Sequence, residues 1–109
     1  MNATPTQYPL IHQVFFWLKN ADNAEDCALL IKGIQTLSAI ETIKQISVGT
    51  PASTESRDVI DSSWQVSETL IFENTAAQLL YQQHPIHVAF IKNYSHLWQK
   101  VLVYDIKTV

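Results

Sequence analysis

The chain has 109 residues, of which 47% are hydrophobic and 16% are charged, and its formal net charge is −3. This length predicts one domain, and a charged fraction below the roughly 25% of an average soluble domain predicts apolar surface that is covered by a partner subunit, encloses a pocket, or does both. Two glycines are too few for a glycine-rich phosphate loop, and one cysteine excludes an intrachain disulfide and a multi-cysteine zinc site. Seven basic residues argue against nucleic acid as a partner.

Residues 1–9 lack the basic and apolar segments of a signal peptide, and no segment approaches the length of a membrane span. We therefore expect a cytoplasmic protein with no membrane partner, in which residues 1–109 form one domain and residues 1–9 are a flexible extension.

Residues 10–18 predict a central β-strand. They are rich in β-branched and aromatic types and apolar on both parities, which is typical of a strand covered on both faces. Alternation with a period of two places a polar residue, His12, on one face with Leu10, Val14, Phe16 and Leu18.

The first helix is predicted from about residue 23 to about residue 38. Asp22, followed three residues later by Glu25, reads as a capping box, and apolar residues then follow helical spacing. Gly33 lies on the apolar stripe, where glycine costs about 1 kcal/mol relative to alanine. We therefore expect a close approach to another backbone at Gly33.

Residues 41–49 predict an edge strand because they are more polar, and a Gly-Thr-Pro turn ends them. The polar segment 52–63 predicts a loop that serves as a lid or a subunit contact. The next strand is predicted at 64–73, with one face formed by Trp64, Val66, Glu68, Leu70 and Phe72.

Asn74 or Thr75 is expected to cap a second helix that runs through Tyr81, and His84-Pro85 interrupts it. A further helical segment carries His87, Phe90, Ile91 and Tyr94, and the last strand is predicted at 101–106.

The predicted order is βαββαβ, which is the ferredoxin-like α+β arrangement: a four-stranded antiparallel sheet with two helices on one face. Because the strands also carry apolar residues on the uncovered face, we expect that face to pack against a second copy in a homodimer.

Several segments resemble the stress-responsive A/B barrel (Dabb) domain family: residues 11–19, 48–51, 57–59, 81–90 with the pattern Y-x-x-H-P-x-H, and 101–105. The resemblance covers nearly the whole chain and implies a dimeric α+β barrel. Most members of the family have no established activity.

One plant member of that family closes a linear polyketide by an aldol condensation without cofactor or metal. By resemblance, its catalytic tyrosine and histidine fall on Tyr81 and His87, and a pocket histidine falls on His12. A further pocket histidine of that enzyme is replaced here by Val66.

A helical spacing of three places Tyr81, His84 and His87 on one face if the helix is nearly continuous. Because the first and third strands are neighbours in a ferredoxin-like sheet, Glu68 is expected beside His12. An imidazole removes a proton next to a carbonyl, and a tyrosine hydroxyl stabilises the enolate. We predict a cofactor-free cyclase, isomerase or lyase for an apolar carbonyl compound, with His87 and Tyr81 as catalytic residues. The predicted pocket contains His12, Val14, Phe16, Val66, Glu68, His84 and Phe90.

Other interpretations of these residues stay open. In these interpretations, His84 shapes the helix break, and His12 is a core histidine whose hydrogen bonds are satisfied. Tyr81 and His87 line a binding pocket but catalyse no reaction. A metal site on these histidines has weak support, because no cysteine or carboxylate stands at ligand spacing.

The alternative from another class is a non-catalytic, dimeric, stress-associated scaffold, and a cofactor-free monooxygenase or haem-binding relative ranks lower. In the scaffold, the aromatic residues and the charged loop serve assembly alone: Trp17, Trp64, Trp98, Phe15, Arg57, Asp58 and Asp61.

Overall fold

The computed structural model describes residues 2–109. The strands are β1 (Leu10–Leu18), β2 (Ile43–Gly49), β3 (Val66–Phe72) and β4 (Trp98–Lys107). The helices are α1 (Ala24–Gln35), α2 (Thr75–Gln83) and α3 (Pro85–Tyr94), with short 3-10 helices η1 (Thr36–Ala39) and η2 (Ser95–Leu97).

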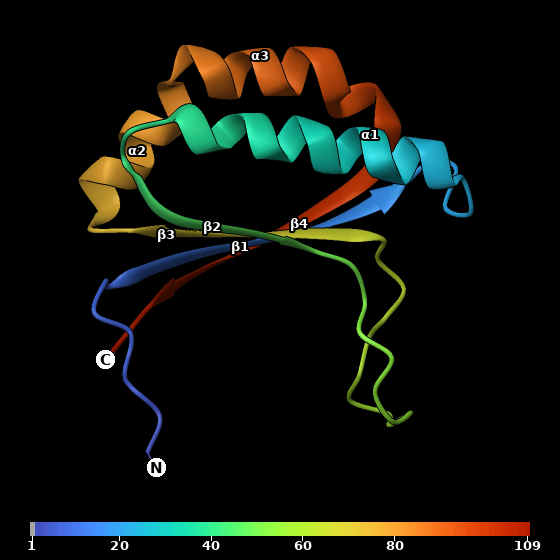
Figure 1. Cartoon of the computed structure of the whole chain (residues 1–109), viewed down its shortest axis with the longest axis horizontal. Coiled ribbons are helices and arrows are strands. Elements are labelled where there is room, and N and C mark those ends of the chain that lie inside the picture. The colour runs from blue at the N-terminus through green and yellow to red at the C-terminus, as the bar shows by residue number, and fades with distance from the viewer. Residues whose placement is uncertain (1) are drawn as a thin grey trace.

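The strands form one antiparallel sheet in the order β2-β3-β1-β4. The helices α1, α2 and α3 all lie over the same face of this sheet, as Figure 1 shows. This confirms the predicted ferredoxin-like α+β fold, with β1 inside the sheet and β2 at an edge.

The side chains of β1 alternate between the two faces of the sheet. Those that point toward the helices are buried, and those between them are half-buried. Each large apolar side chain buried in this way stabilises the fold by about 1.5–3 kcal/mol. The buried members of the row are Leu10, His12, Val14, Phe16 and Leu18.

Asparagine side chains begin two of the helices. Asn23, and not Asp22, caps α1, because its Oδ1 accepts hydrogen bonds at 3.0 Å from two backbone N–H groups of the first turn. The helix therefore begins at Ala24 and ends before η1. Asn74 caps α2 by accepting from the N–H of Ala77 at 2.8 Å, which decides between the two predicted caps.

Three strands begin at other residues than predicted: β2 and β3 begin later, and β4 begins earlier. Trp64 consequently lies outside β3, and its indole N–H donates to the backbone oxygen of Asp61 at 2.9 Å. Its ring centroid is 5.0 Å from that of Phe15, whose side chain points away from the helices. The prediction that Trp64 shares a face with Glu68 is wrong, because the regular alternation starts only at Val66.

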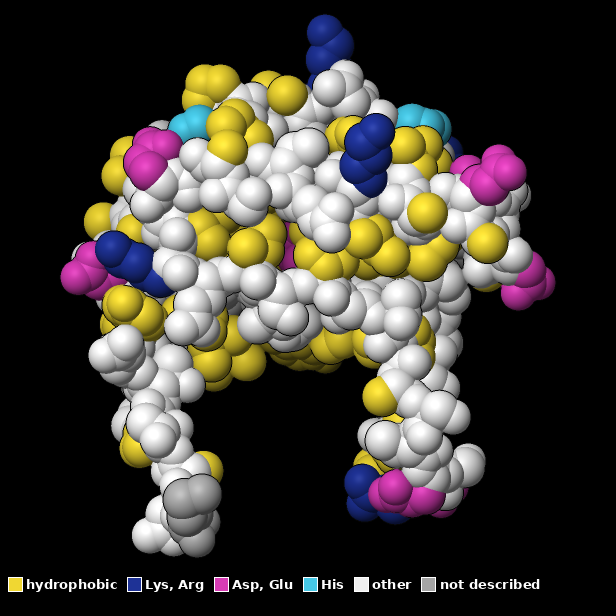
Figure 2. All heavy atoms as spheres, viewed as in Figure 1, with side chains coloured by type: hydrophobic (Ala, Val, Ile, Leu, Met, Phe, Trp, Pro, Cys, Tyr) yellow, Lys and Arg dark blue, Asp and Glu magenta, His cyan; other side chains and the backbone are white. Residues whose placement is uncertain are grey.

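The sheet face that the helices leave uncovered carries an outer apolar surface, formed by Ile11, Phe15, Trp17, Leu102, Tyr104 and Ile106. Residues 2–9 and the loop between β2 and β3 both project from this side of the sheet, at opposite ends of it (Figures 1 and 2). Across residues 2–109, no helix is both long and apolar enough to span a membrane.

Gly33 is buried on α1, and its neighbour is an aromatic side chain. A Cβ atom added there would lie 2.7 Å from ring atoms of Tyr94 at the end of α3. The expected approach to another backbone is therefore wrong, because the Tyr94 ring fills that space.

We predict that Gly33→Ala destabilises the protein by about 1–3 kcal/mol, although alanine favours a helix, because the Tyr94 ring has to move out of a packed position. Urea unfolding measures this change. Gly49→Ala is the matched control, because the nearest atom there, Oγ of Ser67, would be 3.4 Å away. Equal unfolding midpoints for the two variants would contradict the prediction.

Candidate functional site

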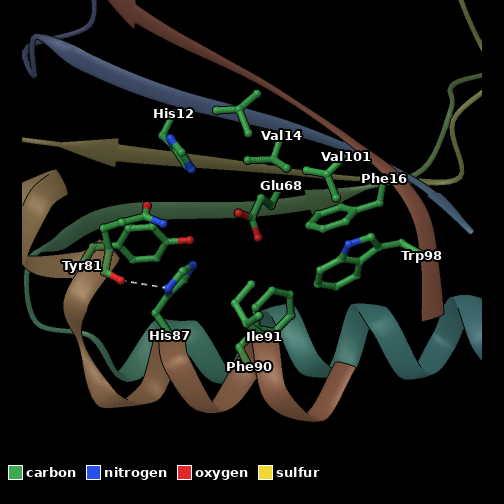
Figure 3. A pocket seen from close by; sticks show the side chains of 12 residues that line it. His12, Val14, Phe16, Glu68, Tyr81, His87, Phe90, Ile91, Trp98 and Val101 are labelled. Atoms are coloured by element: carbon green, nitrogen blue, oxygen red, sulfur yellow. Dashed lines mark hydrogen bonds between the residues drawn. The ribbon is translucent and has the colours of Figure 1, made fainter. Parts of the chain in front are cut away.

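A cavity of about 330 Å³ lies between the helix-covered face of the sheet and the helices α2 and α3 (Figure 3). It is lined by His12, Val14, Phe16, Glu68, Tyr81, Gln82, His87, Phe90, Ile91, Trp98, Val101 and Val103.

The chain turns at His84 and Pro85, and this turn decides which side chains reach the cavity. Pro85 has no backbone N–H and opens α3, while His84 is extended and its Nδ1 accepts from the N–H of Ile86 at 3.1 Å. Its Nε2 lies 3.4 Å from a carboxylate oxygen of Glu41. The prediction that His84 lines the pocket beside Tyr81 is wrong, because these contacts hold its ring outside the cavity.

The same turn brings the rings of Tyr81 and His87 together, with centroids 4.6 Å apart. Nδ1 of His87 lies 3.1 Å from the backbone oxygen of Gln82, which only accepts, so this nitrogen donates and carries the proton of the neutral ring. The other ring nitrogen, Nε2, is directed toward the cavity in Figure 3. Burial lowers the pKa of His87, and its hydrogen bond to Gln82 opposes that change. The imidazole is therefore a neutral base at neutral pH.

His12 contacts Asp105, and not Glu68 as predicted. Its Nδ1 lies 2.5 Å from Oδ1 of Asp105. In the sheet, His12 stands opposite Leu70 on one side and Asp105 on the other, whereas Glu68 stands opposite Val14. The strand register therefore assigns the buried imidazole a carboxylate from β4.

Glu68 lines the cavity with a carboxyl group that is almost fully buried, with 2% of the residue surface exposed. Its Oε2 has no hydrogen-bond partner within residues 2–109. Burial raises the pKa of Glu68 to about 8, although the hydroxyl group of Tyr81, as a hydrogen-bond donor, opposes this rise. Burial and the proximity of Glu68 also raise the pKa of Tyr81. Both groups are therefore mainly protonated at neutral pH.

Apolar side chains form the remaining walls. The ring centroid of Trp98 lies 4.9 Å from that of Phe16 and 5.7 Å from that of Phe90. Val14, Phe16 and Phe90 line the cavity. Val66 does not, because its side chain is fully covered within the core.

Sequence reasoning missed five lining residues. Val101 and Val103 lie on β4 opposite Phe16 and Val14 of β1. The alternation of side chains along β4 identifies these two residues once the pairing of β4 with β1 is known. The missed residues are Gln82, Ile91, Trp98, Val101 and Val103.

The other candidate groups lie apart from the cavity. In the part of the chain that the structure describes, no three His, Cys, Asp or Glu side chains are grouped closely enough to hold a metal ion. In the loop before β3, Arg57 pairs with Glu55 at 3.0 Å, and Asp61 accepts hydrogen bonds from Ser63.

Residues 10–108 match the sequence profile of the family described as "Stress responsive A/B Barrel Domain". A stress-response A/B barrel domain-containing protein of Arabidopsis thaliana, At5g22580, is 27% identical over 77 residues, which are 70% of this chain and 68% of that protein.

Solved structures share the fold. A Dabb family protein with a ferredoxin-like fold from Mesorhizobium loti is 26% identical, with a TM-score of 0.76 over 94% of this chain and 99% of that one. The hydroxynitrile lyase of Passiflora edulis is 19% identical, with a TM-score of 0.77 over 95% and 96%. A ferredoxin-like protein of unknown function from Thermobifida fusca, described as dimeric, is 14% identical, with a TM-score of 0.74 over 99% of each chain.

We predict that Asp105→Ala destabilises the protein by about 1 kcal/mol, because it leaves the buried ring of His12 without its partner. Asp105→Asn is the matched control, since its amide oxygen still accepts a hydrogen bond from Nδ1 of His12. Thermal unfolding compares the two variants with the unmodified protein. If the alanine and asparagine variants are equally stable, the contact contributes nothing measurable.

Proposed function

The chain belongs to the stress-responsive A/B barrel domain family, and we propose that it is a homodimeric protein that binds an apolar, carbonyl-bearing small molecule and transfers a proton on it without a cofactor. The observation that carries this proposal is the convergence of Tyr81 and His87 on an apolar cavity. A neutral imidazole and a phenol are groups that acid–base chemistry at a carbonyl requires.

His87 acts as the general base. Its Nε2 takes a proton from the carbon next to the carbonyl, the electrons of that C–H bond form a C=C bond, and the carbonyl oxygen becomes an enolate oxygen. The hydrogen bond from Nδ1 to the Gln82 carbonyl fixes the ring and its tautomer for this transfer.

Tyr81 stabilises the enolate. Its raised pKa keeps the hydroxyl group protonated, so it donates a hydrogen bond to the developing negative charge. If the substrate is a β,γ-unsaturated carbonyl compound, the negative charge of the enolate extends to the γ-carbon, and return of the proton from His87 to that carbon completes an isomerisation. If the substrate carries a second carbonyl group, attack of the enolate carbon on it forms a C–C bond and an alkoxide, which takes the proton back from His87 and completes a cyclisation.

An open cavity favours ligand binding over a scaffold without a ligand, because a scaffold gains stability by filling that space. The hydroxynitrile lyase of Passiflora edulis shares the fold at 19% identity. That degree of likeness extends to the architecture alone, so the class of reaction proposed here rests on Tyr81 and His87.

The outer apolar surface supports the homodimer. It lies on a sheet face without helices, and the segments that project at its two ends leave a space between them that suits a second copy (Figure 2). The description of the Thermobifida fusca protein as dimeric agrees with this arrangement.

Exchange of α-protons in D₂O tests the proton transfer without knowledge of the natural substrate. With acetophenone as the probe, proton NMR follows the loss of the methyl signal. We expect His87→Gln to slow the protein-dependent exchange about 10²–10⁴-fold. Because the pKa of His87 is lowered, the exchange rate should stay constant as the pH falls to the ordinary value of 6.5 and decrease only below it.

His96→Gln is the control for this experiment, since His96 is an exposed histidine away from the cavity. It should exchange like the unmodified protein. Unchanged exchange in a folded His87→Gln variant would rule out the proposed base.

Sedimentation velocity at micromolar concentration tests the homodimer. We expect the unmodified protein to sediment as two chains and Leu102→Glu, which places a charge on the outer apolar surface, to sediment as one. Leu80→Glu introduces the same change on the exposed side of α2 and should remain dimeric. An unmodified protein that sediments as a single chain would overturn the homodimer.

A further inference from the structure

Glu68 is a buried carboxyl group that the proposed proton transfer does not use. It stands in the middle of the sheet, opposite Val14 on β1 and Val48 on β2, so its immediate neighbours in the sheet are apolar. Figure 3 shows its carboxyl group directed into the cavity. A buried polar atom without a partner is costly, and Oε2 of Glu68 is such an atom in the described part of the chain.

The groups that face Glu68 offer it no permanent positive charge. On the helix side these are Tyr81 of α2 and His87 of α3, and on the sheet side His12 of β1, which is already paired with Asp105 of β4. Within residues 2–109, no lysine or arginine side chain lines the cavity. A carboxylate in this position would be both desolvated and unpaired, so the uncharged acid is favoured.

We propose that Glu68 is an uncharged carboxylic acid whose O–H donates a hydrogen bond to the carbonyl oxygen of the ligand, so that the site selects neutral carbonyl compounds. This rests on the proposed function, since the ligand is the same. With the ligand bound, the hydroxyl group of Tyr81 donates to the ligand oxygen instead of to Glu68, so that Glu68 and Tyr81 act as two donors toward one oxygen. His87 takes the proton from the adjacent carbon. A carboxylic acid kept neutral by apolar surroundings is an effective donor to an enolate oxygen.

Ionisation of Glu68 should abolish this recognition. The pKa of Glu68 is raised to about 8, so the acid form predominates below this pH and the carboxylate above it. A carboxylate oxygen only accepts hydrogen bonds and repels a carbonyl oxygen. The apparent dissociation constant of a neutral carbonyl ligand should therefore rise about tenfold for each pH unit above 8.

Two probes of nearly equal shape test the proposal. Acetophenone carries a carbonyl group, and α-methylstyrene carries a CH₂ group in place of its oxygen. Protein-observed NMR titrations give their dissociation constants from about pH 6 to about pH 10, on either side of the pKa of Glu68. We expect acetophenone to bind more tightly than α-methylstyrene below pH 8 and to lose that advantage above it, whereas α-methylstyrene binds independently of pH.

Two variants separate donation from shape. Glu68→Gln keeps the size and a donor but does not ionise, so the binding of acetophenone should become independent of pH. Glu68→Leu removes this donor and leaves that of Tyr81, so the preference for acetophenone over α-methylstyrene should decrease and should no longer change with pH. Equal affinities of the two probes for the unmodified protein at every pH would overturn the role of Glu68.

A direct titration of the unmodified protein keeps the proposal falsifiable if a variant does not fold. Carbon NMR of labelled glutamate follows the δ-carbon of Glu68, and a pKa near the ordinary value of 4.5 would overturn the uncharged acid. The proposed function fails separately. If acetophenone binds preferentially but His87→Gln leaves the exchange rate unchanged, Glu68 is still a donor to the ligand and the proposed proton transfer by His87 is wrong.

Discussion

The alternation of side chains along β1 is the constraint on which the rest of the structure depends. This strand pairs with β3 on one side and β4 on the other, so each of its residues fixes the position of a neighbour in both strands. Its buried row supplies core side chains as well as three lining residues of the cavity, namely His12, Val14 and Phe16. A shift of one residue in either pairing would turn the partner strand over and remove Glu68 or Asp105 from the cavity side.

The turn at Pro85 is the second determinant of the site. A continuous helix would have placed His84 between Tyr81 and His87 on one face. Because the proline ends that regularity, the His84 ring caps the next helix, while Tyr81 and His87 come into contact across the turn. The helix break at Pro85 therefore determines which polar side chains reach the cavity, together with the residue types themselves.

Most of the fold could be predicted from the sequence, because alternation in 10–18 and the asparagine before α2 are local signals. Contacts between side chains of different strands could not be predicted. The partner of His12 depends on the register between β1 and β4, which periodicity leaves undetermined, so Glu68 was predicted where Asp105 lies. The predicted position of the His84 side chain is wrong for a related reason, because helical spacing does not determine the direction of the chain beyond a proline.

The burial of Glu68 also couples folding to proton uptake. In the unfolded chain this carboxyl group has a pKa near the ordinary 4.5, whereas in the folded protein the pKa is about 8. Between these values the folded state holds a proton that the unfolded state has released. The contribution of this group to stability is therefore fully present below pH 4.5 and decreases by up to about 1.4 kcal/mol per pH unit until the folded state also ionises. The same acid that would hold a ligand thus makes the protein less stable in alkaline surroundings, and a bound neutral ligand would restore part of that stability by keeping the proton in place.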